Sequence, residues 1–180
     1  MRINPEHSIV IAVDYQTKLV PPMSNPRELI HNSEILLKGC KVLNVPIIFS
    51  QQYTKGLGET IPEIAEILEG CPVYDKLTFS CWQDEAIRQA VRTSGRGTVI
   101  ICGIEAHVCV LQTVIDLRAD GYNVVLVEDC IDSRKGSDKA TALKRASLEG
   151  AILTSYEALL FELTRIAGND RFRQISRLVK

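Results

Sequence analysis

The sequence contains no apolar stretch that approaches the roughly 20 residues needed to span a bilayer. Its first seven residues, Met1 to His7, are polar and hold no signal-peptide core. The net charge is −1, from 21 Lys and Arg against 22 Asp and Glu, whereas a nucleic-acid-binding domain usually has a basic patch. We therefore expect a cytoplasmic protein, or one of an organelle matrix, that binds neither membranes nor nucleic acid.

Metal-binding patterns are also missing. No two of the six cysteines form a CxxC pair, and His107 and Cys109 are the only close His/Cys neighbours. One such pair does not supply the four ligands of a structural zinc site. Without a secretory signal, the thiols are expected to be reduced. We expect no metal and no cofactor in a chain whose cysteines are Cys40, Cys71, Cys81, Cys102, Cys109 and Cys130.

What is present is an alternation of short apolar runs with helical patterns over 180 residues, 46% of them hydrophobic. The runs are rich in β-branched residues, as in strands that are buried on both faces. We expect a single domain, 1–180, with a three-layer α/β/α, Rossmann-like fold and a six-stranded, mostly parallel sheet. Right-handed crossovers leave few topologies, and we expect the strand order 3-2-1-4-5-6. Strands are expected at 8–13, 46–50, 72–75, 98–101, 123–127 and 151–153, and helices at 25–44, 62–68, 84–93, 109–121, 139–149, 155–167 and 170–178, with caps at Asn25 and Ser137-Asp138.

The stretch from Cys102 to Val110 is the centre of this pattern. It links the buried strand 98–101 to a helix, and it places Cys109 in or just before the first helical turn. A helix N-terminus carries unpaired N–H groups and a partial positive charge, which favour a thiolate and can hold an oxyanion. The sequence thus indicates a nucleophile at Cys109, although cysteine also serves as a small buried apolar residue.

Two charged residues can assist this cysteine. Ligands in open parallel sheets bind at the switch in strand order, which here lies between the first and fourth strands, so Asp14 and Cys109 are expected to face one crevice. Asp14 is then a candidate general base, or alternatively a cap. Lys76 is a candidate cation that lowers the thiol pKa, or alternatively a surface lysine. His107 has the wrong spacing to share a helix face with Cys109, so we interpret it as structural.

Three segments, in order and at comparable separations, resemble the isochorismatase-like cysteine hydrolase family, and the resemblance covers nearly the whole chain. The family's Asp-Lys-Cys triad falls on Asp14, Lys76 and Cys109. The loop from Gln51 to Gly58 is similar to the isochorismatase-domain-containing branch known from eukaryotes. The three segments are Val13-Asp14-Tyr15-Gln16, Asp75-Lys76 with Phe79-Ser80, and Gly103 to Val110.

The resemblance implies a mechanism. Asp14 takes the proton of Cys109, the thiolate attacks a small amide carbonyl, and water later releases the thioester. The backbone N–H groups of Glu105 and Cys109 form the oxyanion hole, next to a cis peptide bond that maps to Ile104–Glu105. Substrate-pocket positions of the family fall on Gln16, Gln51 and Phe79.

Two differences from the patterns of known family members narrow the range of expected substrates. Nicotinamidases of this family bind a metal through an Asp-x-His pair after the second strand, whereas this chain has Gln51, Gln52 and Tyr53 there, which are poor zinc ligands. True isochorismatases lack the nucleophilic cysteine, so isochorismate is not the expected substrate. The resemblance therefore predicts metal-free cleavage of a C–N bond in a small molecule.

Family members commonly form homo-oligomers, and we expect the same here, with the loop from Gln51 to Gly58 as a candidate contact. Three alternatives remain at this point. An aspartate-nucleophile phosphatase would require a second carboxylate two residues after Asp14, where the chain has Gln16. The other two are a non-catalytic binding or scaffold protein on the same fold, and a redox sensor that uses a reactive thiol.

Overall fold

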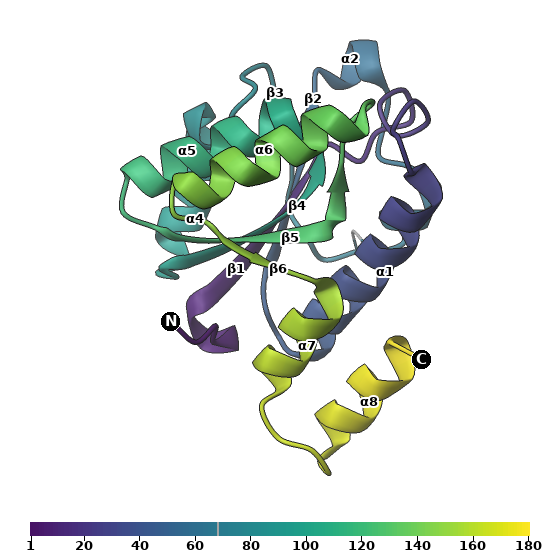
Figure 1. The fold of residues 1–180 in the computed structure, drawn as a ribbon, viewed down its shortest axis with the longest axis vertical. Helices are drawn as coiled ribbons and strands as arrows, with labels where there is room; N and C mark the ends of the chain where they lie inside the picture. The colour runs from purple at the N-terminus through teal and green to yellow at the C-terminus, as the bar shows by residue number, and fades with distance from the viewer. Residues whose placement is uncertain (68) are drawn as a thin grey trace.

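A single six-stranded sheet forms the centre of the computed structural model, which describes residues 1–67 and 69–180 (Figure 1). Every neighbouring pair of strands is parallel, and the order β3-β2-β1-β4-β5-β6 confirms the predicted topology. The strands are β1 Ser8–Val13, β2 Ile47–Gln52, β3 Val73–Lys76, β4 Thr98–Ile104, β5 Asn123–Asp132 and β6 Ile152–Thr154.

Helices cover both faces of this sheet (Figure 1). On one face lie α1 (Pro26–Val42) and α7 (Tyr156–Thr164), against which α8 (Asp170–Leu178) packs. On the other lie α4 (Glu85–Thr93), α5 (Leu111–Ala119) and α6 (Gly136–Leu148). None of the helices within residues 1–67 and 69–180 is long and apolar enough to cross a membrane. The short elements are η1 Pro5–His7, α2 Thr54–Leu57, α3 Pro62–Ala65, η2 Cys81–Gln83 and η3 Ala106–Val110.

Strand alternation divides the core between the two faces. In β1, Val10 and Ala12 join the cluster beneath α1 and α7, whereas Ile9, Ile11 and Val13 join the cluster beneath α4, α5 and α6. All residues of β1, β2 and β4 are buried, because each has a helical layer above and below. This explains why β1, β4 and the first half of β2 are almost continuously apolar in the sequence.

Several predicted boundaries were wrong. The fifth strand was expected to end at Val127, but β5 continues to Asp132 past a register shift against β4. Its polar residues were interpreted as a strand end, yet the extended backbone has side-chain partners, since Asn32 Nδ2 donates to the Asp129 carbonyl (2.9 Å) and Tyr15 Oη to the Cys130 carbonyl (3.1 Å). Of the predicted helix 62–68, α3 accounts for Pro62–Ala65, and position 68 lies outside the described residues.

Of the two expected helix caps, Asn25 is confirmed at the N-cap position of α1, whereas the cap at Ser137-Asp138 is wrong. Asn25 precedes α1 but its side chain makes no capping bond, and its N–H instead donates to Asp132 Oδ2 (2.7 Å) at the end of β5. Helix α6 begins at Gly136, before the expected cap at Ser137-Asp138. The start of α1 is therefore held by a distant strand rather than by its own sequence.

Strands β1 and β4 come into direct contact at Gly103. This residue has a φ of 115°, and a Cβ atom there would lie 2.0 Å from the Val13 carbonyl oxygen. Only glycine accommodates both the backbone conformation and the contact. The close approach occurs just before Asp14 on one strand and just before η3 on the other.

Candidate active site

The carboxyl ends of β1 and β3 and the turn after β4 bring together the three residues predicted as a triad. Asp14 directly follows β1, Lys76 ends β3 and Cys109 lies in η3. Lys76 Nζ donates to Asp14 Oδ2 at 2.9 Å. The side-chain oxygen of Gln52 is 2.6 Å from Lys76 Nζ and 4.0 Å from Cys109 Sγ, and so links the cation to the thiol.

The ion pair between Asp14 and Lys76 is completely buried. Burying two charges is costly unless their remaining hydrogen-bonding capacity is satisfied. Here Ser50 Oγ donates to Asp14 Oδ1 (2.7 Å), and Lys76 Nζ also donates to the carbonyls of Thr78 and Phe79 (3.2 Å each). Both charges therefore have a full set of partners inside the protein.

The ammonium group of Lys76 retains its charge at neutral pH. Burial lowers the pKa of Lys76, but the neighbouring Cys81, Asp14 and Cys109 groups outweigh burial, and the pKa lies above its ordinary value. Asp14 thus always faces a cation.

Cys109 is in the opposite situation. Its side chain is only 6% exposed. Burial raises the pKa of the Cys109 thiol, the Asp14 carboxylate raises it further, and Lys76 only partly opposes them. The expectation of a thiolate at rest was wrong, because burial and the facing Asp14 carboxylate outweigh the effect of the helical turn in which Cys109 lies. The resting group is a thiol with a proton acceptor beside it.

This geometry predicts the alkylation profile of the thiol. The charged and titratable groups that face it are Asp14 from β1, Lys76 from β3 and Cys81 from η2. We expect the rate of iodoacetamide labelling at Cys109, mapped by peptide mass spectrometry, to keep rising past about pH 8.5, the ordinary thiol value. Asp14→Asn removes the facing anion and should shift the profile to lower pH. A plateau in the wild-type profile below about pH 8 would contradict the raised pKa.

Two of the expected pocket residues have their amides engaged by the protein. Gln16 is fully buried, accepts from the Gln52 N–H (2.6 Å), and donates to the carbonyls of Gln52 (3.0 Å) and Gly58 (2.7 Å). Gln51 donates to Thr60 Oγ1 (2.9 Å) and Glu59 Oε2 (3.2 Å). Gln16 thus anchors the end of β2 to the following loop, and a substrate role for either amide remains a prediction.

Phe79 lies differently, with 54% of its surface exposed beside a hollow of about 530 Å³. One wall of this hollow is the segment whose Thr78 and Phe79 carbonyls hold Lys76, and the other is α5, which begins two residues after Cys109. The segment that holds Lys76 thus also lines the hollow, although none of the three candidate triad residues does so. Its lining residues are Thr78, Phe79, Ser80, Gln83, Gln112, Ile115 and Asp116.

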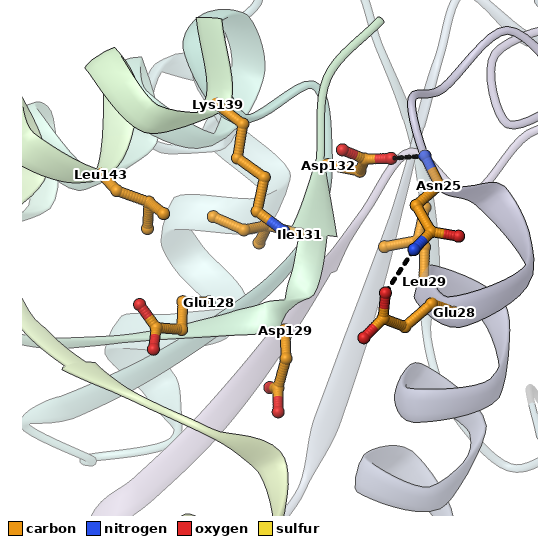
Figure 2. Close-up of a pocket in the computed structure, with 9 residues that line it drawn as sticks. All are labelled: Asn25, Glu28, Leu29, Glu128, Asp129, Ile131, Asp132, Lys139 and Leu143. Carbon is orange, nitrogen blue, oxygen red and sulfur yellow. Dashed lines mark hydrogen bonds between the residues drawn. The ribbon is translucent and has the colours of Figure 1, made fainter. Parts of the chain in front are cut away.

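A second hollow, of about 320 Å³, lies between α1, β5 and α6 (Figure 2). Asp132 is buried there and accepts from the Asn25 N–H, while the Asn25 side chain faces Glu28. None of the candidate triad residues contributes to its lining. We interpret this hollow as the place where the start of α1 packs against the end of β5, held by the hydrogen bond between Asn25 and Asp132.

Two side-chain contacts, to Arg134 and Ser133, hold the turn that carries Cys109. The peptide bond between Ile104 and Glu105 is cis, where the resemblance places one. Glu105 Oε2 accepts from the N–H and Nε of Arg134 (3.1 Å each), and His107 Nδ1 lies 2.9 Å from Ser133 Oγ. Among residues 1–67 and 69–180, no group of three or more His, Cys, Asp or Glu side chains is arranged to hold a metal ion.

The sequence analysis missed Ser50 and Gln52. Both lie on the face of β2 that also carries Ile48, which packs in the cluster beneath α4, α5 and α6, whereas Gln51 points to the opposite face. The predicted strand ended at Ser50, so the alternation was not followed to Gln52. Extending the period of two by one step would have placed Ser50 and Gln52 on the same side.

Comparisons with known proteins agree on one family. The isochorismatase domain model matches residues 8–158. The secreted isochorismatase effector Isc1 of Phytophthora sojae (strain P6497) is 37% identical over 183 residues, which cover 99% of this chain and 87% of that protein. Among solved structures, the MAR1 ribonuclease from Caenorhabditis elegans has a TM-score of 0.93 and 37% identity, over 99% of this chain and 92% of that one. The YcaC gene product from Escherichia coli, described as an octameric hydrolase of unknown specificity, has a TM-score of 0.94 and 25% identity, over 99% and 89%.

Proposed function

Because this chain belongs to the isochorismatase family, we propose that it is a cysteine hydrolase that cleaves an amide-type C–N bond of a small molecule through a thioester at Cys109. The observation that carries this proposal is the buried Asp14–Lys76 ion pair beside the Cys109 thiol. Burying these charges is costly, and an inert buried cysteine requires no such pair. A proton acceptor next to a protonated nucleophile is the arrangement that general-base catalysis uses.

In the proposed reaction Asp14 moves one proton in each half, first from the Cys109 thiol to the leaving nitrogen and then from water to the Cys109 sulfur. The proton of the Cys109 thiol passes to Asp14 as sulfur bonds to the substrate carbonyl carbon. Asp14 then gives this proton to the leaving nitrogen, the C–N bond breaks, and a thioester remains. Water attacks the thioester with Asp14 as base, which releases a carboxylic acid and restores the thiol. Lys76 keeps Asp14 in place and balances its charge.

The oxyanion formed in each step needs hydrogen-bond donors. We assign this role to the backbone N–H groups of Glu105 and Cys109 in the turn after β4. The rest of the substrate would lie toward Phe79 and its hollow, with Gln16 and Gln51 as the further pocket positions. No metal and no cofactor enters this mechanism.

The descriptions of the relatives bear on the oligomeric state, the family branch and the cellular location proposed for this chain. The YcaC structure is described as octameric, which supports a homo-oligomer for this chain. The two matches at 37% identity come from eukaryotes, in agreement with the branch indicated by the loop from Gln51 to Gly58. The Phytophthora relative is called secreted, and a cytoplasmic location without membrane contacts stays a prediction for this chain.

RNA is a less favoured substrate than a small amide, although the Caenorhabditis structure is titled a ribonuclease. Binding to RNA relies on Lys and Arg contacts to phosphates. This chain has a net charge of −1, and the described lining of the hollow beside Phe79 includes no Lys or Arg. The remaining alternatives are a non-catalytic binding protein and a redox sensor.

Trapping the acyl-enzyme tests the proposal directly. The protein would be incubated with a panel of small primary amides and quenched in acid, and its peptides would be mapped by mass spectrometry. We expect an acyl adduct on Cys109, with release of one ammonia for each acyl group transferred. Cleavage of RNA without any adduct would overturn the proposal, as would a Cys109 that binds panel members reversibly or is only oxidised.

A further inference from the structure

The side-chain amide of Gln52 lies between two groups of the candidate triad. Its oxygen accepts from Lys76 Nζ at 2.6 Å, the shortest of the four contacts that the ammonium makes, and lies 4.0 Å from Cys109 Sγ. Gln52 is 8% exposed, so solvent does not replace this oxygen. Asp14 also contacts both groups, but it carries a charge, whereas Gln52 contacts them with a neutral amide.

The orientation of this amide is fixed by its other contacts. Its nitrogen donates to the Leu77 carbonyl (2.9 Å), so the oxygen is the end that faces Lys76. The backbone of Gln52 is held by Gln16, which accepts from its N–H and donates to its carbonyl. Turning the amide over would place its NH₂ group against the ammonium. Gln16 therefore acts on the site through Gln52.

The chemistry of an amide suits this position. A carboxylate there would add a second negative charge beside the thiol, and an apolar side chain would leave an N–H of the buried Lys76 with one acceptor fewer. The amide oxygen holds the cation without neutralising it, and it presents the negative end of a dipole to sulfur. That dipole favours the protonated thiol until a substrate arrives.

We propose that Gln52 is a positioning residue, which holds the Lys76 ammonium and sets how readily Cys109 gives up its proton to Asp14. This inference rests on the proposed function, in which Cys109 is the nucleophile. It assigns to Gln52 an electrostatic effect on sulfur that depends on the charge of residue 52. A residue that only supported β2 would have no such dependence.

Two substitutions of similar size separate these roles. Gln52→Met removes the dipole and should raise the rate of iodoacetamide labelling at Cys109 by about tenfold at about pH 8. Gln52→Glu keeps an acceptor for Lys76 but adds a negative charge, and should lower that rate by about tenfold. Peptide mapping gives the rate for Cys109 separately from the other cysteines.

Asn32→Leu is the matched control. Asn32 is a buried amide that donates to a backbone carbonyl on β5, away from the triad, so it reports the cost of losing a buried amide alone. We expect it to leave Cys109 labelling unchanged. Rates for the two Gln52 variants that change in the same direction, or that match the wild type, would overturn the inference. If Gln52→Met does not fold, a wild-type rate in Gln52→Glu is enough to overturn it.

The proposed function can fail separately. If wild-type Cys109 forms no acyl adduct but the labelling rates diverge as expected, Gln52 tunes a thiol that is not an amidase nucleophile. If the adduct forms and the rates do not diverge, the inference about Gln52 is wrong and the function stands.

Discussion

Replacement of Cys109 by alanine is expected to lower amide turnover by roughly 10³-fold or more, because it removes the thiol that forms the thioester in the proposed reaction. The buried Asp14–Lys76 pair remains in this variant, so its fold should be retained. The measurement is ammonia release from whichever panel amide acylates the wild type. Cys109→Ser should also be strongly impaired, since a hydroxyl beside Asp14 is a much weaker acid than a thiol.

Cys71→Ala provides the matched control for this loss. Cys71 is half-buried, and its Sγ contacts only the Ile67 carbonyl among the hydrogen bonds described, at 3.8 Å. We expect wild-type turnover from this variant. Full turnover by Cys109→Ala would show that the reaction proceeds without a covalent intermediate at this residue.

Lys76→Met should destabilise the protein by about 3–5 kcal/mol, because it leaves the Asp14 carboxylate buried without its cation. The methionine has a similar volume, so the loss reports charge rather than packing. Urea unfolding followed by circular dichroism gives the change in the free energy of unfolding. The double variant Asp14→Asn/Lys76→Met removes both charges and should recover much of this loss.

Lys38→Met is the control with the same substitution and the same ion-pair distance. Lys38 Nζ is 2.9 Å from Glu34 Oε1, as Lys76 Nζ is from Asp14 Oδ2, but the Lys38–Glu34 pair is solvent-exposed on α1. We expect a change below about 0.5 kcal/mol. Equal losses for the two lysines would mean that the burial of the Asp14–Lys76 pair carries no energetic consequence.

Strands β1 and β4 were predictable because each is a buried run that is apolar on both faces, a pattern that depends on local sequence alone. The order of the strands followed from the handedness of crossovers. The end of β5 was not predictable in this way. Its backbone is supported by Asn32 and Tyr15, which lie far away in the chain, and no local pattern records such partners.

In the candidate site, too, some features could be predicted from local sequence and topology and others depend on the folded structure. Asp14 and Cys109 could be placed at one crevice from topology, and Lys76 entered through the resemblance of its motif. Gln52 was missed because the strand was ended two residues early. The state of the Cys109 thiol was predicted wrongly, since a helix N-terminus is visible in the sequence, whereas the burial and the facing carboxylate that outweigh it are set by the fold.

The close contact at Gly103 affects which parts of the protein can change in evolution without moving the candidate site residues. Its α-carbon lies against the backbone of Val13, so main-chain atoms, rather than packed side chains, set the spacing of the two segments that carry the base and the nucleophile. Hydrophobic residues around the sheet can then be exchanged without retuning that spacing. Substitutions in the surrounding loops can then change substrate preference without moving Asp14 relative to Cys109.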